Sequence, residues 1–100
     1  MKHDYKEIFD KTRQLVNDWD PCLFITAGAP KDEYDTLTNK FLSGVINQVD
    51  RDILQSDIID LLDNYYGTHV FNGISQEQQN RLRSDIVELI EKIEKTNANS

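Results

Sequence analysis

The residues best placed for chemistry are three aspartates, Asp57, Asp60 and Asp63, which recur at every third position. On a helix this spacing gathers carboxylates on one face, where they could bind a metal ion or share a proton. General acid–base catalysis, however, needs a carboxylate that is withdrawn from water so that its pKa rises. Nothing in the sequence predicts such burial here. We therefore interpret the three aspartates as a solvated acidic face and a candidate interaction surface.

The other patterns that could carry chemistry are incomplete. Asp50 and Asp52 alternate as in a calcium-binding EF-hand loop, but Leu54 and Leu61 then occupy ligand positions. The four glycines are isolated, which excludes a glycine-rich phosphate loop. Cys22 is the only cysteine, and within its apolar run it is typical of a small core residue rather than a reactive thiolate. We expect no catalytic residue, no cofactor and no metal site.

A second polar cluster begins at Asp20-Pro21. This pair is typical of a helix start, because aspartate caps helix N-termini and proline fits the first helical turn. Since a glycine and a second proline end the stretch, we predict a short helical turn near residues 21–27. A short strand over residues 22–25 is the alternative, because phenylalanine and isoleucine favour strands.

The acids that follow this turn form the second half of the candidate surface. Asp32 or Asp35 is predicted to cap the next helix. Glu33 and Tyr34 are left without a structural task, and a tyrosine beside acids is a plausible recognition pair. The candidate interaction surface therefore comprises Asp32, Glu33, Tyr34, Asp35, Asp57, Asp60 and Asp63. The residues predicted to hold the connection in place are Trp19, Asp20, Pro21 and Pro30.

Apolar residues elsewhere recur at intervals of three and four, which is typical of amphipathic helices. The pattern predicts four main helices at about residues 5–18, 36–48, 51–66 and 76–95, in one all-α domain arranged as a small bundle or an irregular array. Asp50 and Ser75-Gln78 provide start signals. Gly44 falls inside a predicted helix, where a small residue would let another helix approach closely. Residues 96–100 are polar and are expected to form a disordered tail.

The charge balance restricts the class of partner. The 100 residues carry a net charge of −7. Residues 17–35 hold five acids and one lysine, and residues 50–66 hold five acids and one arginine. Nucleic acids and anionic membranes require clusters of lysine and arginine, so we expect neither as a partner. The N-terminus lacks the apolar segment of a signal peptide, and we expect a cytoplasmic protein that is a monomer or a homodimer.

Several of these residues together resemble a known family. The combination of Asn17-Asp18-Trp19-Asp20-Pro21, Ala29-Pro30 and Asp32-Glu33-Tyr34-Asp35, followed by the acidic and aromatic residues 63–67, resembles the YugE-like family of small acidic proteins from Gram-positive bacteria. The resemblance implies an all-helical fold and a domain of unknown function with no catalytic residue. It also hints at a binding role of the kind found in toxin–immunity pairs.

We therefore expect a non-enzymatic protein-interaction module whose acidic surface faces a basic partner. A regulatory or immunity-like binding protein is the sharpest form of this hypothesis. The alternatives are a self-associating structural or accessory protein and a binder of a small molecule.

Overall fold

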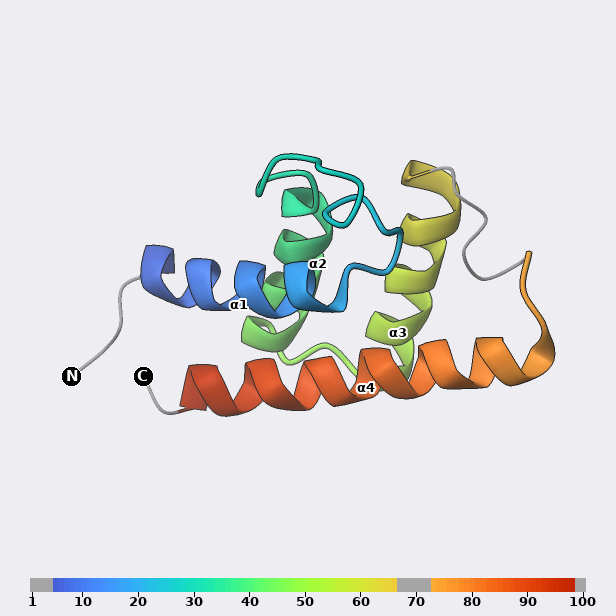
Figure 1. Cartoon of the computed structure of the whole chain (residues 1–100). Coiled ribbons are helices and arrows are strands. Elements are labelled where there is room, and N and C mark those ends of the chain that lie inside the picture. The colour runs from blue at the N-terminus through green and yellow to red at the C-terminus, as the bar shows by residue number, and fades with distance from the viewer. Residues whose placement is uncertain (1–4, 67–72, 99–100) are drawn as a thin grey trace.

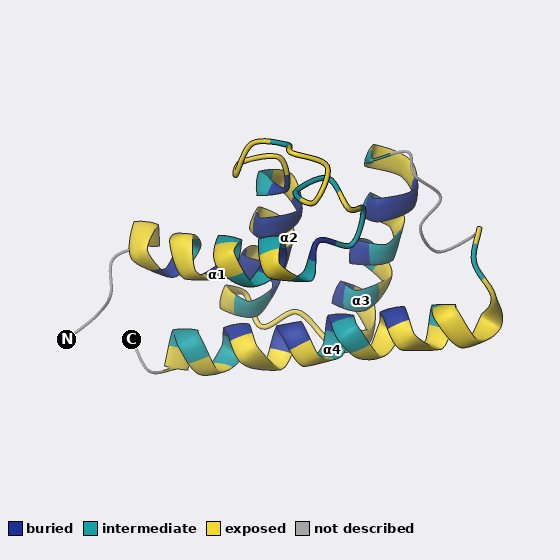
Figure 2. Cartoon of the chain, in the orientation of Figure 1, coloured by how far each residue is buried: buried dark blue, intermediate teal, exposed yellow. Residues whose placement is uncertain are grey.

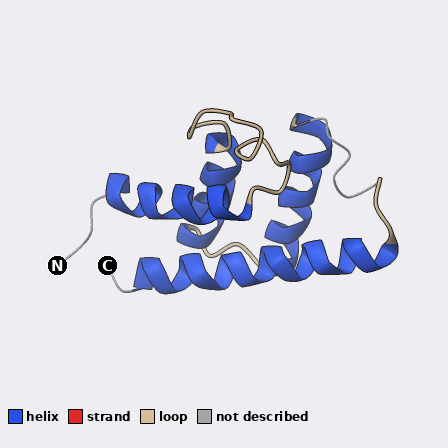
Figure 3. Cartoon of the chain, viewed as in Figure 1, coloured by secondary structure: helices blue, strands red, loops and turns tan. Residues whose placement is uncertain are grey.

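The computed structural model describes residues 5–66 and 73–98. Helices make up 74% of this part of the chain, which contains no strand, so the predicted all-α class is confirmed. The helical segments are α1 (Tyr5–Trp19), α2 (Asp35–Ile46), α3 (Arg51–Asp60), the π-helical segment η1 (Leu61–Tyr65) and α4 (Gln76–Ala98). Figure 3 shows these helices in blue and the long connection between α1 and α2 in tan.

The helices are arranged as two crossing pairs. In Figure 1, α1 and α4 run in opposite directions along one side of the molecule, and α2 and α3 cross them. Each helix of one pair contacts the other pair, and α1 also packs on α4 as α2 does on α3. The connection from Asp20 to Tyr34 folds over the N-terminal end of α2. This arrangement leaves the C-terminal end of α1 beside the middle of α4.

The core lies where the predicted apolar stripes meet. Figure 2 shows buried segments on the inward sides of all four helices and exposed residues on the outer sides. A fully buried leucine, isoleucine or phenylalanine contributes roughly 1.5–3 kcal/mol, so these stripes dominate the stability of so small a chain. The buried apolar residues are Ile8, Val16, Tyr34, Leu37, Phe41, Leu42, Leu54, Ile58, Leu62, Leu82, Ile86, Leu89, Ile90 and Ile93.

The last helix is longer than predicted. It continues to Ala98, so residues 96–98 are helical and the prediction of a disordered tail is wrong for them. The Thr96 hydroxyl donates to the Lys92 carbonyl at 3.0 Å. Lys95 adds a positive charge in the last turn, which interacts favourably with the helix dipole. Residues 99–100 lie outside the described part of the chain.

The predicted third helix is two segments. Its regular α-helical hydrogen bonding ends at Asp60, and the π-helical segment η1 follows, with the Tyr66 N–H bonded to the Leu61 carbonyl at 3.2 Å. A π turn holds one more residue than an α turn and therefore rotates the side chains that follow it. As a result Tyr66 packs against the core while Tyr65 is 63% exposed.

Two predicted helix starts are confirmed. The Asp50 side chain accepts from the Asp52 N–H at 2.9 Å at the start of α3. Before α4, the Ser75 hydroxyl accepts from the Gln78 N–H at 3.2 Å and the Gln78 side chain accepts from the Ser75 N–H at 3.1 Å. This reciprocal pair is the capping box that the sequence predicts. Residues 67–72, which hold most of the loop before α4, lie outside the described part.

Gly44 of α2 packs closely against Leu54 of α3. A Cβ atom built on Gly44 would lie 2.5 Å from Cδ1 and 2.7 Å from Cδ2 of Leu54. Leu54 is itself 2% exposed, so its side chain is surrounded by the core. The expectation that a small residue here admits a neighbouring helix is therefore confirmed.

Substitution Gly44→Ala should destabilise the fold. The gain in helix propensity is about 1 kcal/mol, but overpacking against the buried Leu54 costs about 1–3 kcal/mol. We expect a net loss of up to about 2 kcal/mol in the free energy of unfolding, measured by urea denaturation. Asn39→Ala, at an exposed position of the same helix, is the control and should be neutral or slightly stabilising. A gain of about 1 kcal/mol for Gly44→Ala, the full gain in helix propensity, would contradict the close packing.

Candidate interaction surface

The connection between α1 and α2 is organised around the carboxylate of Asp20. One oxygen, Oδ1, accepts from the Tyr34 hydroxyl at 2.6 Å and from the Ile25 N–H at 3.1 Å. The other, Oδ2, accepts from the N–H of Thr26 at 2.9 Å and from its hydroxyl at 2.7 Å. Asp20 is 7% exposed. A carboxylate this buried is tolerated because both of its oxygens are fully hydrogen-bonded.

Asp20 is not the helix cap that the sequence predicts. Its φ is +48°, whereas a residue that caps a helix N-terminus has a negative, extended φ. The left-handed backbone turns the side chain toward residues 25 and 26 instead of the N–H groups of the next turn. The segment that follows forms turns and no strand, in agreement with the preferred prediction, and the Ala27 N–H bonds to the Leu23 carbonyl at 3.0 Å.

Tyr34 is fully buried, so the prediction that it lies on a recognition surface is wrong. Its hydroxyl donates to Asp20 and accepts from the N–H groups of Cys22 at 2.9 Å and Phe24 at 3.3 Å. Its ring stacks on Phe24, with centroids 5.6 Å apart, and meets Tyr66 at 5.8 Å. Sequence reasoning missed this role because its three hydrogen-bond partners lie 10 to 14 positions away.

The electrostatics of this cluster follow from the hydrogen bonds. Burial by itself would raise the pKa of Asp20, but the bonds from Tyr34, Thr26 and Ile25 outweigh it and lower the pKa to about 2. For Tyr34, burial and the bond to the Asp20 carboxylate both raise the pKa of the phenol. Burial also raises the pKa of Tyr66 to about 12. At neutral pH the aspartate is therefore charged and both tyrosines are neutral, which is the state that the hydrogen bonds require.

The predicted acidic caps of α2 have other partners. Tyr34 occupies the cap position and makes no side-chain capping bond. Asp35 lies in the first turn, where its carboxylate accepts two hydrogen bonds from Arg13, at 2.9 and 2.7 Å. This bidentate pair joins α1 to α2, and the guanidinium also lies 5.1 Å from the centre of the Phe9 ring. Asp32 contributes only its backbone carbonyl, which accepts from the Asp35 N–H.

The three aspartates of the third helix do not share one solvated face, as the sequence suggested. Asp57 is half-buried and lies 3.9 Å from the ammonium of Lys40. Asp60 is exposed, whereas Asp63 is only 6% exposed. The π turn rotates Asp63 away from the exposed side. Of the candidate surface, Asp32, Glu33 and Asp60 are thus exposed and have no ion pair within the described residues.

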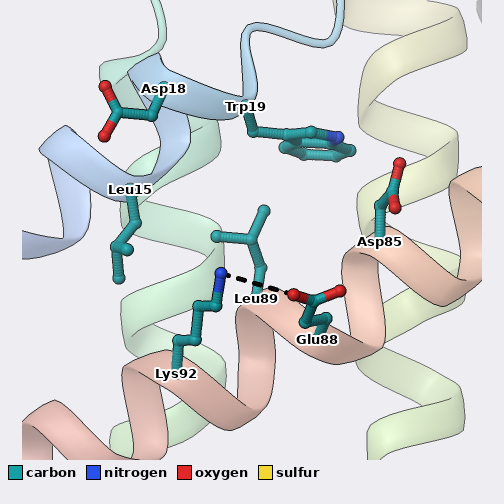
Figure 4. A pocket seen from close by; sticks show the side chains of 7 residues that line it. All are labelled: Leu15, Asp18, Trp19, Asp85, Glu88, Leu89 and Lys92. Atoms are coloured by element: carbon teal, nitrogen blue, oxygen red, sulfur yellow. Dashed lines mark ion pairs between the residues drawn. The ribbon is translucent and has the colours of Figure 1, made fainter.

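Trp19 anchors the end of α1 only in part. Its ring meets Phe41 edge to face, with centroids 6.0 Å apart, and it packs against the core. Part of the indole remains accessible and forms one side of a groove of about 300 Å³ between α1 and α4. Figure 4 shows the groove, which is lined by Leu15, Asp18, Trp19, Asp85, Glu88, Leu89 and Lys92.

This groove was not predicted from the sequence. Its two sides come from residues about seventy positions apart, and local spacing does not indicate which helices become neighbours. The only signal was that Asp85 and Glu88 are three positions apart on the same helix, so that they share a face. Three carboxylates and one ammonium give the groove a negative balance.

The described residues contain neither a cluster of metal-binding side chains nor a membrane-spanning helix. Within residues 5–66 and 73–98, no three side chains of histidine, cysteine, aspartate or glutamate are close enough to hold a metal ion together. Among the helices of that same part of the chain, none has the length and apolar character needed to cross a membrane.

No family model, curated protein or solved structure matches the chain. The resemblance to the YugE-like family stays a prediction.

Substitution Tyr34→Phe should lower the free energy of unfolding by about 2–3 kcal/mol, because it removes the hydroxyl that donates to Asp20 and accepts from the N–H groups of Cys22 and Phe24. Denaturant unfolding measures the change. Tyr5→Phe removes a phenol that is 56% exposed and should alter stability by less than about 0.5 kcal/mol. If both variants lost the same stability, the hydroxyl of Tyr34 would not organise the connection.

The stability that Asp20 provides should depend on pH. Its folded pKa of about 2 is below the usual 3.8, so the folded state binds fewer protons than the unfolded state. The contribution is complete above about pH 4 and is lost as the pH falls to about 2. It is on the order of 2 kcal/mol. The difference in unfolding free energy between wild type and Asp20→Asn should therefore shrink between pH 4 and pH 2, whereas parallel curves would contradict the assignment.

Proposed function

We propose that this chain is a non-enzymatic interaction module that binds a basic protein through its acidic faces. The observation that supports this function is the imbalance of exposed charge after ion pairing. Each of six basic residues already faces an acid within 4 Å; they are Lys6, Lys11, Arg13, Lys40, Arg51 and Lys92. Asp32, Glu33 and Asp60 have no such neighbour in the described structure and are exposed.

The surplus of acid has a physical consequence for association. Unpaired surface charges attract an oppositely charged protein over distances up to the Debye length, about 8–10 Å at physiological salt. Such steering raises the association rate more than it tightens the final complex. An immunity-like or regulatory partner with a basic surface fits this electrostatic pattern. The resemblance to small acidic proteins of toxin–immunity loci supports the same proposal.

Self-association is a second candidate function because exposed apolar residues lie at the turn between α2 and α3. Ile46 is 41%, Val49 is 37% and Ile53 is 58% exposed. Single exposed apolar residues are common on monomers, so this observation weighs less than the charge imbalance. Analytical ultracentrifugation of wild type and Ile53→Glu tests it: a dimer that the substitution dissolves supports self-association, and a monomer at all concentrations excludes it.

Charge reversal at Glu33 tests the main proposal. Glu33 is exposed and takes no part in capping or pairing, so Glu33→Lys should leave stability nearly unchanged, and this is measured first. A basic partner captured from native cell extract should then associate several-fold more slowly with Glu33→Lys than with wild type at low salt. Added salt should slow the wild type toward the variant.

Glu77→Lys is the matched control, because it makes the same charge change at another exposed acid, at the start of α4. It should slow association less than Glu33→Lys does. An unchanged association rate for Glu33→Lys at low salt, or a captured partner that is itself acidic, would overturn the proposed function.

A further inference from the structure

The geometry points to an arginine-binding subsite in the groove between α1 and α4, in which the guanidinium of a partner protein stacks on Trp19 and pairs with Asp85. This inference rests on the proposed function, since it names the partner side chain that one acidic region receives. It concerns residues that lie outside the surface predicted from the sequence.

The aromatic side of the groove is already fixed in place. Trp19 is the last residue of α1 and its ring meets Phe41 edge to face, so the core holds the indole in one orientation. Figure 4 shows the indole above Leu89, with Leu15 on the neighbouring turn of α1. The accessible part of the indole is thus bordered by apolar side chains, where a cation over an aromatic face interacts more strongly than in open water.

The three carboxylates of the groove are not equivalent. Glu88 lies 3.4 Å from the ammonium of Lys92 on the next turn of α4. Asp18 accepts a hydrogen bond from the Gln14 side chain at 2.8 Å, and in Figure 4 its carboxylate is turned away from the indole. Asp85 is half-buried and has no hydrogen bond or ion pair within the described structure. It is therefore the carboxylate that is available to a ligand.

This combination favours arginine over the other cationic groups of proteins. A guanidinium is planar and stacks on an aromatic face while its edge donates two parallel hydrogen bonds to a carboxylate. In Figure 4 the Asp85 carboxylate lies on the side of the indole that carries the ring nitrogen, and both residues line the groove. A groove of about 300 Å³ has room for one long side chain. A lysine ammonium could pair with Asp85 but gains less from stacking.

Lys92 is the internal competitor for the site. Its ammonium lies in the groove and already offsets Glu88. Removing that positive charge should strengthen the binding of an arginine side chain, because a like charge at the site repels the incoming guanidinium. If the acidic surface bound cations without a defined site, removal of any nearby lysine would strengthen binding equally.

The test uses the fact that Trp19 is the only tryptophan of the chain, so its fluorescence and its indole N–H resonance report on the groove alone. The probe is an acetylated and amidated pentapeptide, Gly-Gly-Arg-Gly-Gly, titrated into the full chain at low salt. The expected result is a saturable shift of the indole resonance, with a dissociation constant of about one millimolar. The citrulline peptide, which has the same shape without the charge, should give no shift, and the lysine peptide should bind several-fold more weakly.

Two pairs of variants locate the contact. Asp85→Asn should weaken binding of the arginine peptide about fivefold to tenfold, whereas Glu77→Gln, the same loss of charge on the same helix, should change it less than twofold. Lys92→Gln should strengthen binding about threefold, and Lys95→Gln, one turn nearer the end of α4, should have a smaller effect. Unfolding curves of all four variants verify that each is folded.

The outcomes separate this inference from the proposed function. Binding that shifts backbone resonances near Asp32 and Glu33 but leaves the indole unchanged would overturn the subsite and preserve the acidic interaction module. If Asp85→Asn and Glu77→Gln weakened peptide binding equally, this would likewise overturn the subsite and preserve the acidic interaction module. If the peptide shifts no resonance, the arginine subsite fails. The proposed function is then decided separately, by the association rates of the captured partner.

Discussion

The hydrogen bond between the buried carboxylate of Asp20 and the Tyr34 hydroxyl, 2.6 Å long, is the constraint on which the rest of the structure depends. It joins the two ends of the only long connection in the described structure. Closing such a loop costs chain entropy, and burying a carboxylate costs solvation. The remaining bonds to residues 25 and 26 compensate for the solvation cost, so the loop adopts one conformation in which the polar groups around Asp20 satisfy one another.

The position of Tyr34 then determines what packs around it. Its ring contacts Phe24 from the loop and Tyr66 from the end of η1. The Tyr66 hydroxyl in turn accepts from the Leu37 N–H at 3.2 Å, in the first turn of α2. The Tyr66 hydroxyl thus accepts the hydrogen bond that an acidic N-cap side chain would usually accept. The π turn that brings Tyr66 inward is therefore tied to the start of a helix that lies far from it in the sequence.

These dependencies explain which parts the sequence could predict. Amphipathic spacing locates the helices because each apolar stripe is a local pattern, and Ser75-Gln78 and Asp50 are capping signals whose partners lie two or three residues away. The tight contact at Gly44 was also foreseeable. Asp20, Tyr34 and Asp63 were misjudged because their environment comes from distant segments. A polar residue next to proline or in an acidic run resembles a cap or a surface residue until the tertiary contacts are known.

The same contacts change where the negative charge of the molecule is available. In the sequence, residues 17–35 form one acidic segment. In the structure, however, Asp20 is buried and hydrogen-bonded inside the loop, and Asp35 is paired with Arg13. Only part of that charge reaches the solvent, while Asp85, outside both acidic segments, faces the groove without a partner. Because Asp20 directly follows Trp19 in the chain, the bonds that bury Asp20 also fix where α1 ends and hence where the indole lies. The inward-facing residues of this motif therefore hold the position of the one aromatic ring that borders the groove.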